Sequence, residues 1–159
     1  MTESVLSHKK MLIVDDEEDV LTVVGEEINQ ACSDCTIDKA KDYEKAAGLL
    51  KSKDYDLVIL DIMGVRGFDL LQIAVTRGFK VAMVTAHALS SEALKKSHDM
   101  GAMAYLPKEK FGDLVPFLED VLKHKYGTSW KRLLEKFGDF FDRTLEDDWK
   151  EKAGVKFWW

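Results

Sequence analysis

Short runs of apolar residues alternate with amphipathic stretches along the first 121 residues of the chain. Apolar runs of this length, with few or no polar positions inside them, are typical of strands that are buried on both faces of a parallel sheet. The second run is the weakest of the five. The runs that predict strands are residues 11–14, 35–37, 57–60, 81–84 and 104–106.

Between and after these runs, apolar residues recur three or four positions apart, which predicts helices with one buried face. Strands that alternate with helices imply right-handed crossovers between parallel strands. We therefore predict an α/β fold of five strand–helix units, (βα)5, in which helices cover both faces of a five-stranded parallel sheet. The predicted helix faces lie within residues 20–28, 43–50, 70–74, 93–101 and 114–122.

The C-terminal part of the chain departs from this alternation. Tyr126 and Gly127 interrupt the pattern, and Thr128 or Ser129 is suited to cap a new helix. A mainly aromatic stripe then predicts an amphipathic helix, with Gly138 as a weak point. The stripe consists of Trp130, Leu133, Leu134, Phe137, Phe140, Phe141, Leu145 and Trp149.

We expect three parts: an N-terminal tail (1–8), an α/β domain (9–124) and an aromatic-rich helical extension (125–159). A chain of 159 residues, 46% of them hydrophobic, suits one packed domain with a small appendage. No apolar stretch is long enough to predict a membrane span, and the first residues do not resemble a signal peptide. With only two cysteines, which form no framework of disulfides, the expected location is cytoplasmic.

The net charge of −6 comes from an acidic excess in the first 121 residues, while the remainder is weakly basic. An acidic domain argues against a nucleic-acid-binding surface, which needs clustered positive charge. The extension is also short for a DNA-binding module and has no helix with clustered Lys and Arg. We therefore expect no nucleic-acid partner and no DNA-binding output domain.

Reactive side chains follow four of the predicted strands. Asp15 and Asp16 follow the first strand, Asp61 the third and Thr85 the fourth, and Lys108 comes just after the fifth. Ligands of parallel α/β sheets bind beyond the carboxyl ends of the strands. Three carboxylates at this edge would need a hard, oxygen-liganded cation such as Mg²⁺ to relieve their repulsion. A carboxylate nucleophile beside a metal, a hydroxyl and an amine suits a phosphoryl group.

At the segments 11–17, 56–63, 84–86 and 104–108, the chain resembles the receiver domain of two-component response regulators, in particular chemotaxis-regulator-like receivers. The resemblance extends over residues 9–123 and implies a flavodoxin-like, doubly wound (βα)5 fold. It implies a phosphoprotein of a phosphorelay that signals by protein–protein contact. Such a protein is not an enzyme beyond slow self-phosphorylation and self-dephosphorylation.

The resemblance also assigns roles to single residues. Asp61 would be the phosphoacceptor, receiving its phosphoryl group from a sensor histidine kinase or a phosphotransfer protein. Thr85 would donate a hydrogen bond to the phosphoryl group, and Lys108 would pair with it. Tyr105 stands at the position of the family's switch aromatic, which turns inward when Thr85 moves toward the phosphate.

The metal site that the resemblance implies holds Mg²⁺. Asp15, Asp16 and Asp61 would be its acidic residues, and the backbone carbonyl of Met63 would complete the protein ligands. Met63 and His87 occupy positions that tune the lifetime of the phosphate in the family. We expect the bulky Met63 side chain to hinder the attacking water and to lengthen that lifetime.

The loop after the third strand departs from the family pattern. Val65 replaces the usual proline, and Gly67 comes six residues after Asp61 instead of eight. This shortening favours one alternative, a receiver-like interaction module that works without phosphorylation. A second alternative is a phosphatase or phosphotransferase with an aspartate nucleophile. Such enzymes usually carry an acid two residues further on, where this chain has Met63.

The function of the extension stays open at the level of sequence. Its stripe suits a helix packed on its own domain, a homodimer contact or a helix that binds an unknown downstream protein. A membrane-surface helix is less favoured, although Trp158 and Trp159 fit an interface. The candidate partner-binding residues are Trp130, Phe137, Phe141 and Trp149.

Overall fold

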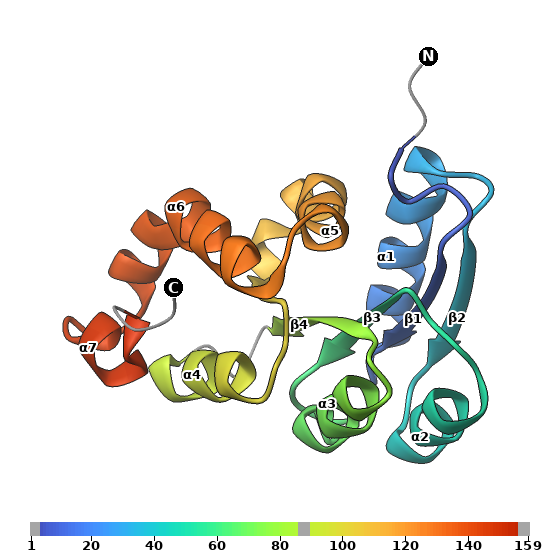
Figure 1. The fold of residues 1–159 in the computed structure, drawn as a ribbon, viewed down its shortest axis with the longest axis horizontal. Helices are drawn as coiled ribbons and strands as arrows, with labels where there is room; N and C mark the ends of the chain where they lie inside the picture. The colour runs from blue at the N-terminus through green and yellow to red at the C-terminus, as the bar shows by residue number, and fades with distance from the viewer. Residues whose placement is uncertain (1–3, 86–89, 156–159) are drawn as a thin grey trace.

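A computed structural model describes residues 4–85 and 90–155 of the chain. Five parallel strands form one sheet in the order β2-β1-β3-β4-β5, which is the flavodoxin-like, doubly wound arrangement (Figure 1). The predicted α/β fold is confirmed. The strands are β1 (Lys10–Val14), β2 (Thr36–Ala40), β3 (Leu57–Asp61), β4 (Lys80–Thr85) and β5 (Ala104–Pro107).

The helices cover both faces of the sheet. Helices α1 and α5 lie together on one face, and α2 and α3 pack against each other on the other (Figure 1). A short 3₁₀ segment, η1, joins β5 to α5. The bounds are α1 (Glu18–Ala31), α2 (Tyr43–Ser52), α3 (Gly67–Thr76), α4 (Ser91–Asp99), η1 (Lys108–Asp113), α5 (Leu114–Lys123), α6 (Tyr126–Thr144) and α7 (Trp149–Ala153).

The second strand was the hardest to locate because it lies at an edge of the sheet. Strand β2 runs from Thr36 to Ala40, further along the chain than the predicted residues 35–37. It includes Asp38 and Lys39, since an edge strand has polar, partly exposed positions. The three central strands, in contrast, are almost wholly buried and match the apolar runs.

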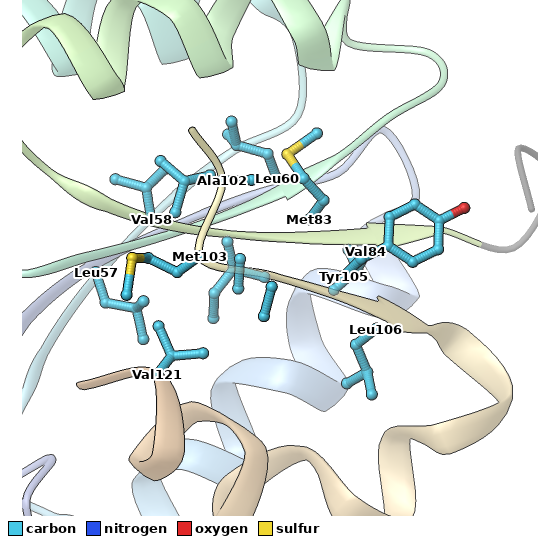
Figure 2. Packing of buried hydrophobic residues seen from close by; sticks show 14 of the residues in the cluster. Leu57, Val58, Leu60, Met83, Val84, Ala102, Met103, Tyr105, Leu106 and Val121 are labelled. Carbon is cyan, nitrogen blue, oxygen red and sulfur yellow. The ribbon is translucent and has the colours of Figure 1, made fainter. Parts of the chain in front are cut away.

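The core lies between the sheet and the helices on each face. Figure 2 shows side chains of β3, β4 and β5, among them Leu57, Met83 and Leu106, packed with Val121 of α5. At the end of α5, the ammonium group of Lys80 donates hydrogen bonds to the carbonyl oxygens of Val121, Leu122 and His124, at 3.2, 2.9 and 3.3 Å. A cation beside the last carbonyls stabilises a helix end. The first residue of β4 therefore fixes the point where the chain leaves the sheet domain.

The extension begins earlier than its capping residues predicted. Helix α6 starts at Tyr126, after a connector of only His124 and Lys125, and both Tyr126 and Gly127 lie inside it. No side chain caps its first turn. The prediction that Thr128 or Ser129 caps the helix is therefore wrong. The Tyr126 hydroxyl donates to the carbonyl oxygen of His98 in α4, so a tertiary contact holds the start of the helix.

The aromatic stripe is divided between two helices. Helix α6 continues through Gly138, where an added Cβ would meet nothing within 4 Å, and ends at Thr144. Leu145 then takes an extended backbone conformation while its side chain stays buried, and α7 begins at Trp149. The break therefore lies at residues 145–148 and not at Gly138.

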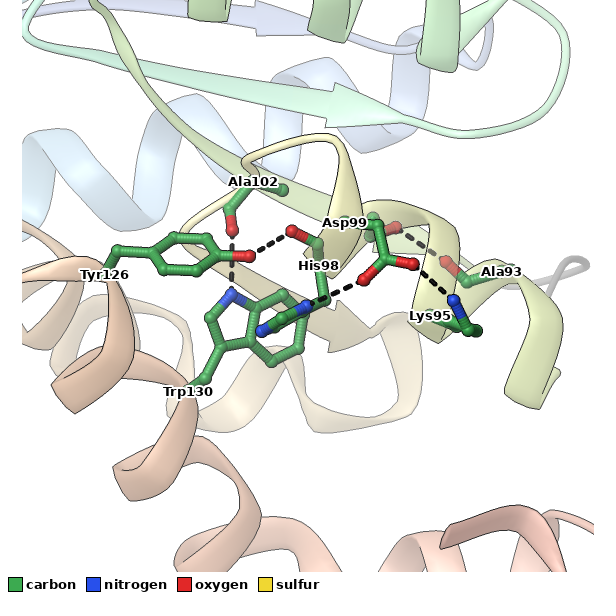
Figure 3. A network of polar contacts seen from close by, with 8 residues as sticks. Ala93, Lys95, His98, Asp99, Ala102, Tyr126 and Trp130 are labelled. Atoms are coloured by element: carbon green, nitrogen blue, oxygen red, sulfur yellow. Dashed lines mark hydrogen bonds and ion pairs between the residues drawn. The ribbon is translucent and has the colours of Figure 1, made fainter. Parts of the chain in front are cut away.

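Both helices of the extension pack on the domain that precedes them. Helix α6 lies against β5, and α7 lies beside α4 (Figure 1). Trp130 donates its indole N–H to the carbonyl oxygen of Ala102 at 2.8 Å, and its ring packs against that of His98 (Figure 3). The extension thus covers the outer edge of the sheet. None of the helices within residues 4–85 and 90–155 has the length and apolarity that a bilayer span requires.

Candidate functional site

The strand order brings the predicted reactive residues to one edge of the sheet. Strand β3 lies between β1 and β4, so Asp61 at its end is a neighbour of both the Asp15 and the Thr85 segments. Thr85 is in register with Pro107, and Lys108 follows directly. The side chains of Asp15, Asp61 and Thr85 are buried. These residues therefore form one recessed site at the carboxyl ends of the strands, where parallel sheets bind ligands.

Asp15, Asp16 and Asp61 form an acidic cluster. Each offers a carboxylate oxygen, and these three atoms lie within 4.8 Å of one another. Among residues 4–85 and 90–155, no other group of three acidic, His or Cys side chains is so close together. The Lys108 ammonium group lies 2.9 Å from Asp15 Oδ2 and 3.7 Å from Asp61 Oδ2.

A divalent cation fits this cluster. One ammonium group against three carboxylates leaves two negative charges, which such a cation would balance. Asp15 Oδ2 is buried, and the partner that the described residues give it is the Lys108 ammonium group, a single positive charge shared with Asp61. Hard oxygen donors of this kind are the ligands that Mg²⁺ prefers. The acidic triad can therefore hold a metal ion.

Burial and mutual repulsion change the protonation of the acidic cluster. Burial, together with the negative charge of Asp15, raises the pKa of Asp61 to about 7, while Lys108 acts in the opposite direction. Burial also raises the pKa of Asp15, against the hydrogen-bond and charge contributions of Lys108. Burial alone would lower the pKa of Lys108, but its contacts with Asp15 and Asp61 raise it. The site thus favours a cation and loses stability when its carboxylates ionise alone.

Two glycines shape the loop after β3. Gly64 has a φ of +84°, and an added Cβ would lie 2.3 Å from an oxygen of the Asp16 carboxylate. At Gly67 an added Cβ would lie 2.1 Å from the backbone oxygen of Asp61. Sequence reasoning missed Gly64, although two glycines in so short a loop signal close backbone approach. The shortened loop is therefore packed tightly against the acidic cluster.

Of the two residues expected to tune the lifetime of the phosphate, the structure describes Met63. The Met63 side chain is 54% exposed, in the loop beside Asp61. The metal-ligand role of its carbonyl stays a prediction. His87 lies outside the described residues.

Tyr105 lies on β5 between the site and the extension. The residue is fully buried, and its ring centroid lies 6.4 Å from that of Phe141 in α6. Burial raises the pKa of its phenol, with a backbone hydrogen bond from Ser90 acting in the opposite direction. In Figure 2 the labelled ring of Tyr105 lies apart from the packed side chains of β3. Its role as a switch stays a prediction.

The four candidate partner-binding residues are buried within the chain itself. Trp130 and Phe141 are fully buried, and Phe137 and Trp149 nearly so. Of the alternatives that the sequence left open, the packing of the extension on its own domain is the one observed. Partner binding through these residues stays a prediction, and it would require the extension to detach. Trp158 and Trp159 lie outside the described residues.

Of the two cysteines, Cys32 is a buried thiol. Cys32 and Cys35 are free thiols, and Cys32 is buried at the end of α1. Burial and a hydrogen bond to Asp34 raise the pKa of Cys32 to about 11, so its thiol is protonated at neutral pH.

Comparisons with known proteins agree with this geometry. The sequence model of the response regulator receiver domain matches residues 11–118. A receiver domain protein (CheY-like) from Methanospirillum hungatei JF-1 is 25% identical, with a TM-score of 0.64 over 78% of this chain and 98% of that chain. NtrX from Brucella abortus is 26% identical, with a TM-score of 0.64 over 86% of this chain but 30% of that chain.

The fold is shared more widely. The BeF3-activated DrrB receiver domain is 22% identical, with a TM-score of 0.62 over 73% of this chain and 98% of that chain. A comparison with curated proteins gave no match. The family match covers well over half of the 159 residues and includes Asp15, Asp16, Asp61, Thr85 and Lys108. The chain therefore belongs to the response regulator receiver domain family of two-component signalling.

Proposed function

We propose that the chain is a response regulator of a two-component phosphorelay, in which Asp61 accepts a phosphoryl group from a sensor histidine kinase or a phosphotransfer protein. The observation that carries the proposal is the position of Lys108, whose ammonium group lies within 4 Å of both Asp15 and Asp61 at the edge of the sheet. We further propose that it signals by contact with another protein.

The chemical step is a transfer between two nucleophiles. A carboxylate oxygen of Asp61 forms a bond to the phosphorus of a phosphohistidine, and the P–N bond breaks with its electron pair returning to the imidazole nitrogen. The products are an acyl phosphate on Asp61 and an unmodified histidine on the donor. Asp61 must be ionised to attack, so the charge of Lys108 beside it assists by favouring the carboxylate.

The surrounding residues have separate roles in this proposal. Lys108 would exchange its contact with Asp15 for the new phosphoryl oxygens, and Thr85 would donate a hydrogen bond to them. Asp15, Asp16, Asp61 and the backbone carbonyl of Met63 would hold Mg²⁺, whose chemistry is to screen the charge of the phosphoryl oxygens. The chain is thus a phosphoacceptor, with at most slow self-phosphorylation and self-dephosphorylation.

Intact-protein mass spectrometry tests the proposal. The protein is incubated with acetyl phosphate and Mg²⁺, beside Asp61→Ala and the control Asp54→Ala, whose aspartate is an exposed partner of Arg77 away from the acidic cluster. We expect one phosphoryl group on the wild type and on Asp54→Ala, and none on Asp61→Ala or in EDTA. No adduct on the wild type, while a known receiver is labelled in parallel, would instead favour a module that works without phosphorylation.

A further inference from the structure

The extension contacts the two chain segments that leave the acidic site. The first is the start of α4, six residues after Thr85. Here the buried Ser91 hydroxyl donates to Glu146 Oε1, which lies in the turn between α6 and α7. Helix α7 also packs along α4. The turn of the extension is therefore attached to the segment that follows β4.

The second contact lies just beyond Lys108. The ammonium group of Lys110 in η1 lies 4.8 Å from the ring centroid of Phe140 in α6. At the other end of η1, Lys136 Nζ lies 3.8 Å from Asp113 Oδ1. The segment that begins with Lys108 is thus tied to α6 by a cation–π contact and an ion pair.

Between these two contacts, aromatic rings join the sheet to the extension. Tyr105 of β5 packs on Phe141 of α6, and Phe141 lies 5.6 Å, centroid to centroid, from Trp149 of α7. The three rings are almost completely buried. Packed rings of this kind shift between discrete arrangements and do not deform continuously. A movement of Tyr105, or of strand β5, would therefore disturb the packing of α6 and α7.

We propose that α6 and α7 form a cap whose attachment is thermodynamically linked to the state of Asp61, so that phosphorylation loosens the cap. This inference rests on the proposed function. In the unphosphorylated site, Lys108 is held by Asp15 and Asp61 while Lys110, two residues on, holds Phe140. A phosphoryl group on Asp61 gives Lys108 a new anionic partner and shifts the start of η1, which weakens the contacts that were formed around its present position.

If the state of Asp61 changes the attachment of the cap, the attachment of the cap changes the affinity of the acidic site by the same factor. The proposal can therefore be tested by measuring either the extension or the site. Hydrogen exchange of the backbone amides in residues 126–153 is measured with and without Mg²⁺ and beryllofluoride, a mimic of the phosphoryl group. We expect exchange in this segment to accelerate by about fivefold or more in the wild type, the lower range of allosteric coupling. Asp61→Ala should show no acceleration. Unchanged exchange in a wild type that takes up phosphoryl groups would overturn the cap and leave the proposed function intact.

The reciprocal experiment loosens the cap and measures the site. Glu146→Ala and Lys110→Ala each remove one contact, and Glu135→Ala and Lys131→Ala are matched controls at exposed positions of α6. We expect the first pair to bind beryllofluoride with Mg²⁺ about fivefold more tightly than the wild type, and the two control variants to bind it as the wild type does. Equal affinities in all five proteins would overturn the linkage. Absence of phosphoryl uptake in every protein would overturn the proposed function, and the cap with it.

Discussion

The indole N–H of Trp130 donates a hydrogen bond of 2.8 Å to the carbonyl oxygen of Ala102, and both residues are completely buried. This bond joins the extension to the residues just before β5. Trp130→Phe would keep most of the apolar contact but leave the carbonyl oxygen without its donor. We expect the free energy of unfolding to fall by about 1–3 kcal/mol in urea titrations. Lys131→Ala, on the exposed side of the same turn, should stay within about 0.5 kcal/mol of the wild type, and equal losses in the two variants would contradict the prediction.

The raised pKa of Asp61, about 7, predicts how the metal-free protein responds to pH. Between the ordinary pKa of an aspartate and this value, the native state binds more protons than the unfolded state, so stability decreases as pH rises through that window. Asp61→Asn removes the charge that must be buried. In EDTA we expect this variant to be more stable than the wild type at pH 8, by an amount on the order of 2–4 kcal/mol, with the difference much smaller at pH 4.

Urea unfolding at both pH values checks this behaviour, with Asp54→Asn as the control at an exposed aspartate. Added Mg²⁺ should restore the wild type at pH 8 because binding to the native state stabilises it. A wild type that gains stability from pH 4 to pH 8 by as much as Asp61→Asn would refute the assignment of a raised pKa.

Gly67→Ala tests the tight loop after β3. The added methyl carbon would lie 2.1 Å from the backbone oxygen of Asp61, and a backbone atom cannot turn aside as a side chain can. We expect the melting temperature to fall and phosphoryl uptake on Asp61 to be lost, with about 1–3 kcal/mol less stability. Gly48→Ala is the matched control, since nothing lies within 4 Å of the added carbon inside α2. It should stabilise the protein by about 0.5–1 kcal/mol, as expected for alanine in a helix. Normal uptake by Gly67→Ala would show that the loop tolerates movement.

Met63→Asn tests the lifetime of the phosphorylated state. An exposed, bulky apolar side chain beside Asp61 is expected to obstruct the water that hydrolyses the acyl phosphate. Replacement by a smaller, polar side chain should accelerate dephosphorylation by about tenfold, which corresponds to about 1.4 kcal/mol in the barrier. The rate is followed by intact mass after removal of the donor. Val23→Asn, at the other large exposed apolar position of the described residues, should leave the rate unchanged.

The fold and the acidic cluster could be predicted because both follow from short-range patterns. Continuous apolar runs identify the central strands, and the rule that parallel strands end at one edge brings Asp15 and Asp61 together. The edge strand β2 was displaced in the prediction because the polar residues Asp38 and Lys39 break its apolar run. A strand with one face exposed to solvent contains polar residues, so its hydrophobic pattern is harder to recognise than that of a strand buried on both faces.

What the sequence could not provide depends on contacts between distant residues. No local pattern tells that Lys108 lies closer to Asp15 than to Asp61, or that Gly64 lies against the Asp16 carboxylate. An aromatic stripe also suits several partners equally, so its packing on β5 was one alternative among others. The break of the helix at Leu145 also carried no recognised signal in the sequence, where the stripe continues at helical spacing to Trp149.

The connector of two residues between α5 and α6, His124 and Lys125, has a consequence for any downstream partner. It holds α6 beside the face that the helix covers, at an effective concentration set by geometry and independent of the amount of protein. For short linkers this concentration is about millimolar. A free helix with the same intrinsic affinity would have to reach that level to displace half of the tethered one. A partner that binds the same face must therefore bind it more tightly than the helix does, or reach it when the helix has already detached.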